Sequence, residues 1–385
     1  MVEMATALQP AVPQTFEAAA ATLAQCSVAG TAVRIRGAGT KLGWGRPADP
    51  PDVELRSTAL TEIVEHNAGD LTAIMEAGVP LARAQQTFAR AGQMLALDPP
   101  TGADGAATIG GIVATGDSGP LRHRYGAPRD LVVGMTFALG DGTIARTGSK
   151  VIKNVAGYDL AKLFAGSFGT LGMILSVSVR LHPLPATTAT ALGSTANPDV
   201  LSAAALVLTA APFEFEALDV GWHAGRGELL ARCGGTEAAR RCKRAARLLR
   251  EQELEQIDVV ADDELLWERQ RARQRSTHGA LIRLAARPSQ LASVLRAVAD
   301  CDGTLVGRAA LGCSFVELEV DAVGRLRRAL PPGSVSIVLD APAEARRELD
   351  PWGSPDAGAL ELMRRIKARF DPTGVCNPGL FVGGI

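Results

Sequence analysis

The clearest pattern in the chain is a strict alternation of residue types over residues 172–181. It sets Met173, Leu175, Val177, Val179 and Leu181 on one side and Gly172, Ile174, Ser176, Ser178 and Arg180 on the other. Since successive side chains of a strand point to opposite faces, this period of two predicts a half-buried β-strand. A short helix is predicted just before it, where Leu160, Leu163 and Phe164 form one stripe. Asp159 can cap this helix and Gly166 can end it.

Hydrophobic periodicity predicts several further elements in the first half of the chain. A helix is expected over residues 81–91, closed by Gly92. Strands are expected at residues 31–36 and 71–77, and a β-hairpin at residues 131–146. Residues 98–126 are rich in glycine and are expected to be irregular.

The composition changes after residue 185. Residues 186–197 are small and polar, which predicts a linker. Beyond it, strands are expected at residues 214–220, 228–233, 281–285, 315–320 and 335–339, and helices at residues 236–253, 262–275, 289–300 and 360–370. This order favours an antiparallel sheet with helices on one side, and therefore an α+β fold. The arginine-rich helix at residues 238–250 is interpreted as a solvated face.

Length and charge narrow the class of protein. The chain has 385 residues, which favours two domains, and 47% of them are hydrophobic. Its net charge of -1 gives no sign of the basic surface that a nucleic-acid-binding protein needs. No apolar run approaches the roughly 20 residues that span a bilayer, and the N-terminus lacks a signal-peptide pattern. A cytoplasmic location is the default expectation.

The cysteines and histidines give no sign of a metal centre. The six cysteines and five histidines are scattered, without a C-x-x-C pair or two histidines at ligand spacing. Zinc and iron–sulfur sites require close spacings, so no metal is expected in this chain.

Three glycine-rich segments are the candidates for ligand binding. The first, residues 36–41, follows a predicted strand and can form a nest of N–H groups for phosphate oxygens, although a plain turn fits equally well. It lacks the spacing of a Rossmann or Walker A loop. The second, residues 108–116, leaves a bare backbone that suits a flavin, or else packs a helix tightly on a sheet. The third, residues 150–181, contains the alternating strand; the glycines that open this strand let a flat ligand lie on the backbone, or else simply form a turn between helix and strand.

These segments carry a resemblance to a known family. The motifs are R-G-A-G-T-K-L-G-W-G-R at residues 36–46, A-G-Q-M-L-A-L-D-P-P at 91–100, T-I-G-G-I-V-A-T-G at 108–116, K-N-V-A-G-Y-D-L at 153–160, G-S-F-G-T-L-G-M-I at 166–174 and F-D-P-T-G-V-C-N-P-G at 370–379. Together they resemble the vanillyl-alcohol oxidase (PCMH-type) flavoprotein superfamily. Within it, they are similar to the FAD-binding E subunits of bacterial glycolate oxidases.

The resemblance implies a fold, a division of the chain and a set of binding residues. It implies a PCMH-type FAD-binding domain of two subdomains at residues 1–187, a ferredoxin-like α+β cap at 188–345 and a C-terminal segment at 346–385 that returns to the FAD domain. The pyrophosphate is then expected at Arg36, Gly37, Ala38, Gly39, Thr40 and Lys41. The flavin ring and ribityl chain are expected at Pro99, Pro100, Thr108, Gly110, Gly111, Ala114 and Gly116. The remaining contacts are expected from Asn154, Gly157, Tyr158, Gly169, Gly172 and Ile174.

The resemblance also bears on how FAD is attached and on catalysis. Relatives with covalent FAD use histidine or cysteine, whereas Thr40 stands nearest the usual histidine here, so noncovalent FAD is expected. The related catalytic subunit typically carries a histidine-rich metal cluster in its cap, which this chain lacks. Arg283 or Arg308 could hold a substrate carboxylate, although a surface or packing role is the favoured alternative for each. His123 is a weak candidate for the proton acceptor.

Three functions follow from these expectations. The leading hypothesis is an FAD-binding subunit of a complex that oxidises glycolate to glyoxylate. Its expected partners are a paralogous catalytic FAD subunit and an iron–sulfur subunit. The expected location is the cytoplasm, or the inner face of the membrane if the partners attach the chain there. The alternatives are a stand-alone FAD-dependent D-2-hydroxy-acid dehydrogenase and a non-catalytic flavoprotein scaffold. The residues leave open which hydroxy acid is used and which acceptor takes the electrons.

Overall fold

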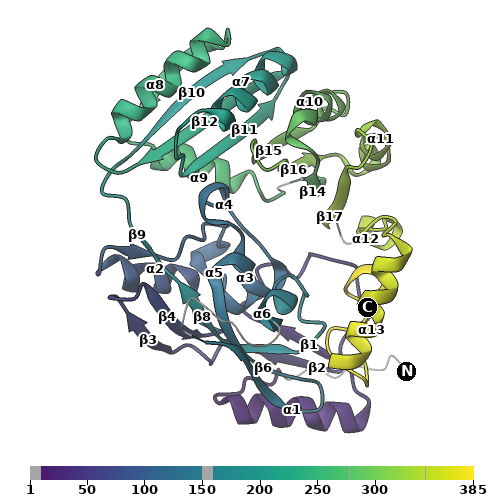
Figure 1. The fold of residues 1–385 in the computed structure, drawn as a ribbon. Coiled ribbons are helices and arrows are strands. Elements are labelled where there is room, and N and C mark those ends of the chain that lie inside the picture. Colours follow the sequence, from purple (N-terminus) through teal and green to yellow (C-terminus); the bar gives the residue numbers. More distant parts are fainter. Residues whose placement is uncertain (1–9, 150–158, 277, 343) are drawn as a thin grey trace.

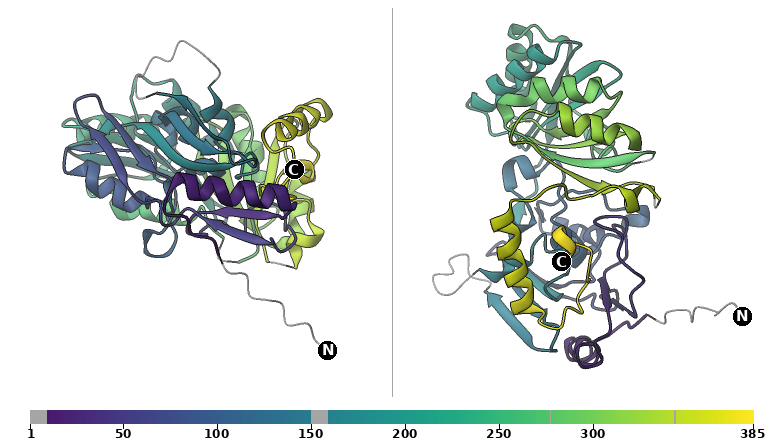
Figure 2. Two further views of the ribbon diagram at one scale, coloured as in Figure 1. Left: turned by 90° about the horizontal axis from the view of Figure 1, so that it is seen from below. Right: turned by 90° about the vertical axis from the view of Figure 1, so that its right-hand side faces the viewer.

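A computed structural model describes residues 10–149, 159–276, 278–342 and 344–385. Two bodies, each built on a β-sheet, lie one above the other, and the C-terminal helices run along the side of the lower one (Figure 1). These helices are α12 (Ala345–Glu348) and α13 (Ala357–Phe370). The view from the side shows the chain leaving the upper body and descending to the lower one (Figure 2). The C-terminal tail therefore ends beside segments from the start of the chain.

The lower body is built around a five-stranded antiparallel sheet with the order β3-β4-β8-β6-β7. Its strands are β3 (Ile63–Asn67), β4 (Thr72–Glu76), β6 (Val132–Ala138), β7 (Ile144–Gly148) and β8 (Met173–Arg180). One face packs against α2 (Leu81–Ala89), α3 (Ile109–Thr115) and α6 (Leu160–Phe164), and the other against α1 (Phe16–Ala29). The predicted hairpin and the predicted helices at 81–91 and 160–164 are confirmed, and Asp159 caps α6 by accepting the Lys162 N–H.

Smaller elements complete the lower body. Strands β1 (Val33–Arg36) and β2 (Val53–Arg56) form a parallel pair, and β5 (Gln93–Met94) pairs with β9 (His182–Pro183). The short helices are α4 (Arg122–Tyr125) and α5 (Pro128–Leu131). Short 3₁₀ turns occur at Ala103–Gly105, Pro288–Gln290, Val320–Ala322 and Val382–Gly384.

The alternating strand is more deeply buried than its pattern predicts. It lies at the centre of the sheet, and its second face is covered too, with Ile174 6% and Ser176 7% exposed. A register shift between Thr136 and Phe137 in its pairing with β6 interrupts the alternation. As a result, Met173 and Leu175 join the core beneath α1, whereas Ile174, Val177 and Val179 join the core beneath α2 and α3. The prediction of a half-buried strand was wrong in this respect, because α3 covers the face that was expected to be open.

The upper body, here called the cap, is an eight-stranded antiparallel sheet with the order β13-β10-β12-β11-β15-β16-β14-β17. Its strands are β10 (Thr188–Thr195), β11 (Ala217–His223), β12 (Arg226–Gly234), β13 (Glu255–Val260), β14 (Ala280–Ala285), β15 (Thr304–Arg308), β16 (Cys313–Leu318) and β17 (Val335–Asp340). Helices α7 (Pro198–Ala210), α8 (Ala238–Glu251), α10 (Leu291–Ala299) and α11 (Val323–Ala329) pack on one face. Helix α9 (Glu264–Ala272) packs on the other through Trp267, which departs from the expected one-sided arrangement.

Two expectations about irregular or connecting segments were wrong. The predicted linker at 186–197 is strand β10, which is hydrogen bonded to both β12 and β13. Its residues are small and polar, so its burial comes from its neighbours in the sheet rather than from its own side chains. Strands β13 and β15 and helix α7 were not predicted. The glycine-rich stretch at 98–126 contains helix α3, which Thr108 caps by accepting the Gly111 N–H. In the described part of the chain, no helix is both long and apolar enough to cross a lipid bilayer.

Candidate cofactor site

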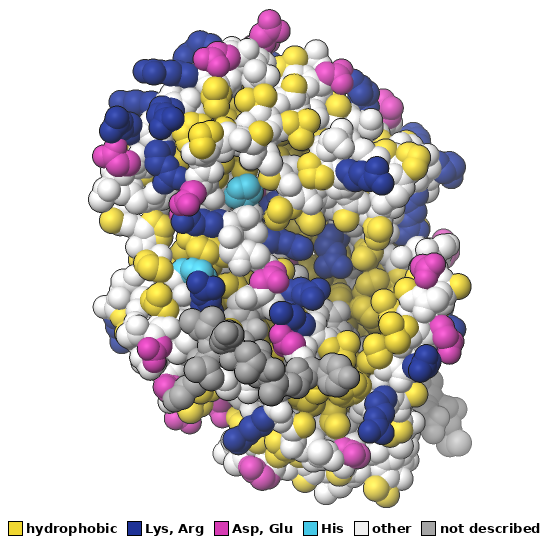
Figure 3. All heavy atoms as spheres, in the orientation of Figure 1, with side chains coloured by type: hydrophobic (Ala, Val, Ile, Leu, Met, Phe, Trp, Pro, Cys, Tyr) yellow, Lys and Arg dark blue, Asp and Glu magenta, His cyan; other side chains and the backbone are white. Residues whose placement is uncertain are grey.

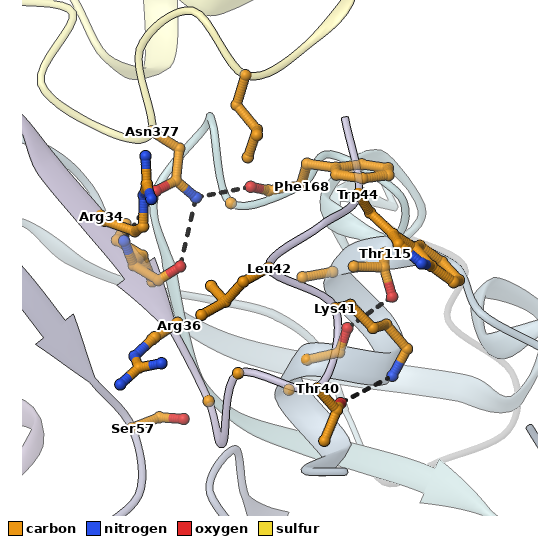
Figure 4. A pocket seen from close by; sticks show the side chains of 18 of the residues that line it. Arg34, Arg36, Thr40, Lys41, Leu42, Trp44, Ser57, Thr115, Phe168 and Asn377 are labelled. Atoms are coloured by element: carbon orange, nitrogen blue, oxygen red, sulfur yellow. Dashed lines mark hydrogen bonds between the residues drawn. The ribbon is translucent and has the colours of Figure 1, made fainter. Parts of the chain in front are cut away.

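A pocket in the lower body brings together segments that are far apart in the sequence. It is lined by the loop after β1, one side of α3, the start of β8 and the C-terminal tail (Figure 4). In sequence these segments span residues 34–48, 108–115, 168–174 and 377–380, with Arg346 of α12 added at one side. The C-terminal tail reaches the pocket because Val33 in β1 forms a bridge with Cys376.

The loop after β1, residues 37–41, exposes unused backbone donors to this pocket. Among the described residues, none of its five N–H groups has a hydrogen-bond acceptor. The loop is held in shape by turns in which Leu42 N–H donates to Gly39 and Trp44 N–H to Lys41. Gly39 has a φ of 83°, a conformation that glycine adopts without strain. Consecutive free N–H groups form a nest that binds anionic oxygens.

The two cations that the sequence offered to the phosphate are already paired. Arg36 lies 3.0 Å from the Glu54 carboxylate, and Lys41 lies 3.4 Å from that of Asp117. Burial lowers the pKa of Lys41, although the neighbouring Asp117 opposes this shift. Asp117 is itself fully buried and also binds Arg275 of the cap at 2.6 Å. The positive charges of Arg36 and Lys41 are thus largely balanced by carboxylates of the protein itself.

The two adjacent glycines of α3 have different surroundings. A methyl group on Gly110 would lie 2.7 Å from the Ala77 side chain and 3.0 Å from its carbonyl oxygen. Gly110 therefore packs α3 closely against the turn after β4, which is the structural alternative considered from the sequence. A methyl group on Gly111 would approach only the Thr108 hydroxyl, at 3.1 Å, and would otherwise extend into the pocket.

Asn377 joins three parts of the pocket. Its side-chain oxygen accepts the Ile35 N–H at 2.8 Å, and its amide nitrogen donates to the Phe168 carbonyl at 2.7 Å (Figure 4). The tail motif Asn-Pro-Gly thereby fixes the end of the chain to β1 and to the turn before β8. Phe168 itself stacks at its edge on Trp352, and with Trp44 and Leu380 it provides an apolar side to the pocket.

Most of the residues predicted for the cofactor line this one pocket. They are Arg36, Gly37, Ala38, Gly39, Thr40, Lys41, Thr108, Gly110, Gly111, Ala114, Gly169, Gly172 and Ile174. Pro99, Pro100 and Gly116 do not line it; the Pro100 carbonyl accepts a hydrogen bond from Arg275 instead. Asn154, Gly157 and Tyr158 lie outside the described residues. Lining residues that the prediction missed include Arg34, Leu42, Trp44, Arg46, Ser57, Phe168, Arg346, Asn377 and Leu380.

Comparisons with known families agree with this pocket. Residues 9–148 match the family described as "FAD binding domain", and residues 354–380 match "FAD linked oxidases, C-terminal domain". In these two segments the chain is similar to the PCMH-type FAD-linked oxidases. FAD is its cofactor, and the free N–H groups, bare glycine backbone and apolar side of the pocket suit its diphosphate and ring system.

Individual relatives match parts of the chain. It is 37% identical over 155 residues to the glycolate oxidase subunit GlcE of Escherichia coli, which covers 40% of this chain and 43% of that protein. It is 36% identical over 164 residues to the glycolate oxidase subunit GlcD of Bacillus subtilis, covering 43% and 34%. The matches therefore span less than half the length of these relatives.

A solved structure extends the likeness to the whole fold. An alkyldihydroxyacetonephosphate synthase superposes with a TM-score of 0.67 at 12% sequence identity, covering 95% of this chain and 76% of that one. At this identity the likeness concerns the architecture alone, including the cap and the returning C-terminal helix.

A second cavity of about 370 Å³ adjoins the FAD pocket, and Trp44 lines both. It lies between the loop after α3, helix α5 and the cap strands β14, β16 and β17, and includes the side chains of Arg122, Arg129 and Arg283. The space-filling view shows basic side chains beside an apolar hollow between the two bodies (Figure 3). Among the described residues, no three histidine, cysteine, aspartate or glutamate side chains are placed to hold a metal ion.

The two arginines proposed for a substrate carboxylate differ in availability. Arg308 is 1% exposed and forms a bidentate pair with Asp219 at 3.0 and 3.1 Å, with a further bond to Gln274. Arg283 lines the cavity and has no hydrogen bond or ion pair among the described residues. Burial lowers its pKa, and the nearby Arg122 lowers it further. Both arginines line the cavity, but of the two only Arg283 has its guanidinium donors free among the described residues.

His123 does not contact the cofactor pocket. It lies in α4, lines neither cavity, and its Nδ1 is buried without a partner among the described residues. Burial and the neighbouring Arg124 lower its pKa. His123 follows the glycine segment closely in sequence, which suggested a position near the flavin ring. Helix α4 instead places it outside both cavities.

Proposed function

We propose that this chain is an FAD-binding subunit of a complex that oxidises a 2-hydroxy acid, with glycolate as the leading candidate substrate. The observation that carries the proposal is Arg283, an unpaired and partly buried cation in a cavity next to the FAD pocket. The named activities of the relatives, glycolate oxidase subunits and D-lactate and D-2-hydroxyglutarate dehydrogenases, all concern small anionic hydroxy acids.

In this proposal, FAD is held without a covalent bond. The described lining of the pocket contains neither histidine nor cysteine, the residues that form such bonds in relatives. The N–H groups of residues 37–41 hold the diphosphate, and the backbone at Gly111 lies against the cofactor. FAD, when bound, supplies the two-electron acceptor.

The neighbouring cavity then binds the substrate anion. The Arg283 guanidinium can hold a carboxylate through two parallel N–H donors, and Arg122 adds positive charge nearby. Trp44 forms a wall shared with the FAD pocket and helps to exclude water from the passage between the two.

We propose a subunit in preference to a self-sufficient dehydrogenase. The described linings of both cavities contain no histidine, so in this part of the chain no imidazole is placed to take the proton of a substrate hydroxyl. A paralogous catalytic flavin subunit would supply that step, and an iron–sulfur subunit would carry the electrons away. The assembly would lie in the cytoplasm or at the inner face of the membrane through its partners.

The test is anaerobic reduction of the bound flavin. The purified chain is mixed with glycolate, D-lactate or D-2-hydroxyglutarate, first alone and then with the paralogous and iron–sulfur subunits, and bleaching of the flavin absorbance is followed. Bleaching only in the complex supports the subunit role. Bleaching of the chain alone would establish the stand-alone dehydrogenase, for which the free Arg283 is the favouring observation. A chain that copurifies with FAD but is never bleached, alone or in the complex, would be the scaffold.

A further inference from the structure

The cationic side chains that line the FAD pocket differ in whether they already have a partner within the protein. Five of them line it: Arg34, Arg36, Lys41, Arg46 and Arg346. Arg36 and Lys41 are paired with carboxylates, and Arg34 donates to the Asp49 carbonyl at 3.5 Å. Among the described residues, Arg34, Arg46 and Arg346 have no carboxylate partner, and of these three only Arg346 has a buried guanidinium nitrogen without a hydrogen-bond partner.

Arg346 reaches the pocket from a different part of the fold. It lies in α12, which follows β17, the last strand of the cap, and lies between that strand and α13 (Figure 1). Its Nη1 donates to the Gly43 carbonyl at 2.9 Å, and its Nε is buried without a partner among the described residues. The same loop is held a second time where Arg46 N–H donates to the Leu380 carbonyl at 3.0 Å.

We propose that Arg346 binds the diphosphate of FAD and thereby ties retention of the cofactor to the segment that leaves the cap. The Gly43 carbonyl fixes the guanidinium against the loop that continues from residues 37–41, and Arg346 lines the same pocket as those residues, whose N–H groups are free of acceptors among the described residues. Most of its donors remain unused, and a planar guanidinium matches phosphate oxygens through paired hydrogen bonds. Arg46, an exposed residue of the same loop, adds a further positive charge to the lining of this pocket.

This assignment has a structural consequence. The loop supplies N–H donors from the lower body, whereas Arg346 supplies charge from the chain that has already passed through the cap. FAD then joins two segments about 300 residues apart in sequence, in addition to the one direct bond between Arg346 and Gly43. The proposal concerns binding of the cofactor, so it holds whichever hydroxy acid the protein oxidises and whether or not this chain turns over substrate.

The experiment measures flavin binding to the apoprotein by fluorescence quenching. Arg346→Gln should weaken FAD binding roughly 10- to 100-fold, because it removes a charge-assisted contact. Riboflavin, which has the same ring system without phosphate, should bind the variant and the parent protein alike. Rising salt should weaken FAD binding more in the parent than in the variant, because the variant has lost one charged contact.

The control is Arg347→Gln, which changes the next residue of α12, an exposed arginine that does not line the pocket. It should leave FAD binding within about twofold of the parent. Arg346→Lys keeps the charge and should bind FAD more tightly than Arg346→Gln, which provides a test if the glutamine variant folds poorly. Equal losses for FAD and riboflavin, or equal losses in the 346 and 347 variants, would overturn the proposal.

Discussion

The FAD pocket and the adjoining cap cavity share Trp44, but the loop at residues 36–41 of the pocket and the cap cavity offer positive charge to a ligand in opposite ways. In the FAD pocket, Arg36 and Lys41 are neutralised by Glu54 and Asp117, and the loop presents backbone N–H groups instead. In the cap cavity, the side chain of Arg283 itself is unpaired. An arginine or lysine near a site is therefore available to a ligand only if it does not already form an ion pair with a carboxylate of the protein.

Arg283 and Arg308 show the same contrast within one sheet. They lie on β14 and β15, which β16 separates in the sheet, and Asp219 on β11, the other neighbour of β15, pairs only with Arg308. The first arginine is available for binding, and the second contributes to the structure of the cap. Substitutions of the two arginines test this division of roles.

The largest effect is expected from Arg308→Met. Removing one member of a buried ion pair leaves Asp219 without its partner, which typically costs about 3–5 kcal/mol in free energy of unfolding. Chemical denaturation of the apoprotein measures this loss. Arg283→Met should change the free energy of unfolding by less than about 1 kcal/mol, because no partner is left unpaired. Arg308→Met combined with Asp219→Leu should recover much of the loss.

If Arg308→Met folds as stably as the parent, the assignment of Arg308 to structure would be wrong. If Arg283→Met instead proves the more destabilising change, Arg283 would have a structural role in the cap rather than a role in binding.

The two glycines of α3 provide the next test, on the side of the FAD pocket. Gly110→Ala should destabilise the apoprotein by about 1–3 kcal/mol, because its methyl group overlaps Ala77. Gly111→Ala should cost less stability and lower the affinity for FAD, because its methyl group enters the pocket. Thermal unfolding of the apoprotein and FAD titration separate the two effects. Normal FAD affinity in Gly111→Ala would place the cofactor away from this part of α3.

The fold was predicted best where apolar residues recur along the sequence with the period of a helix or a strand. The β6–β7 hairpin and helices α2 and α6 have regular apolar spacing and turn residues at their ends. Strand β10 was taken for a linker, because Thr-Ala-Thr-Ala has no large apolar side chains; its neighbours β12 and β13 supply the hydrogen bonds that make it a strand. The double burial of β8 depends on α3 and on a register shift, neither of which local pattern reveals.

The glycine motifs predicted the backbone segments that line the site, whereas the charged side chains were poor guides to which cations are free. The backbone at residues 37–41, 110–111 and 169–172 lies together as the motifs implied. Arg346 carried no local signal, because its place in the pocket depends on the course of the chain after the cap. The pairing of Lys41 with Asp117 joins residues from two distant loops, so spacing in the sequence could not disclose it.

Arg283→Met should weaken the response to substrate without changing FAD content. If Arg283 holds the substrate carboxylate, the glycolate concentration needed for half reduction of the flavin in the complex should rise roughly 10- to 100-fold. Arg250→Met, at the exposed end of α8, is the matched control and should leave it unchanged. An unchanged requirement in the Arg283 variant would remove the cap cavity of this chain from the substrate site and leave only its role in binding FAD.

The smallest effect is expected from His123→Gln, which tests a residue outside both cavities. The pKa of His123 is lowered from 6.5 by burial and by Arg124, so the unfolded chain takes up a proton at a higher pH than the folded one. The free energy of unfolding should therefore fall as pH drops below about 6.5, and it should fall less steeply in the variant. His182, whose pKa is also lowered by burial, supplies a background that both proteins share. Denaturation between pH 5 and 8 measures the difference, and the rate of flavin reduction should stay unchanged at neutral pH; a large drop in that rate would make His123 a participant in the reaction.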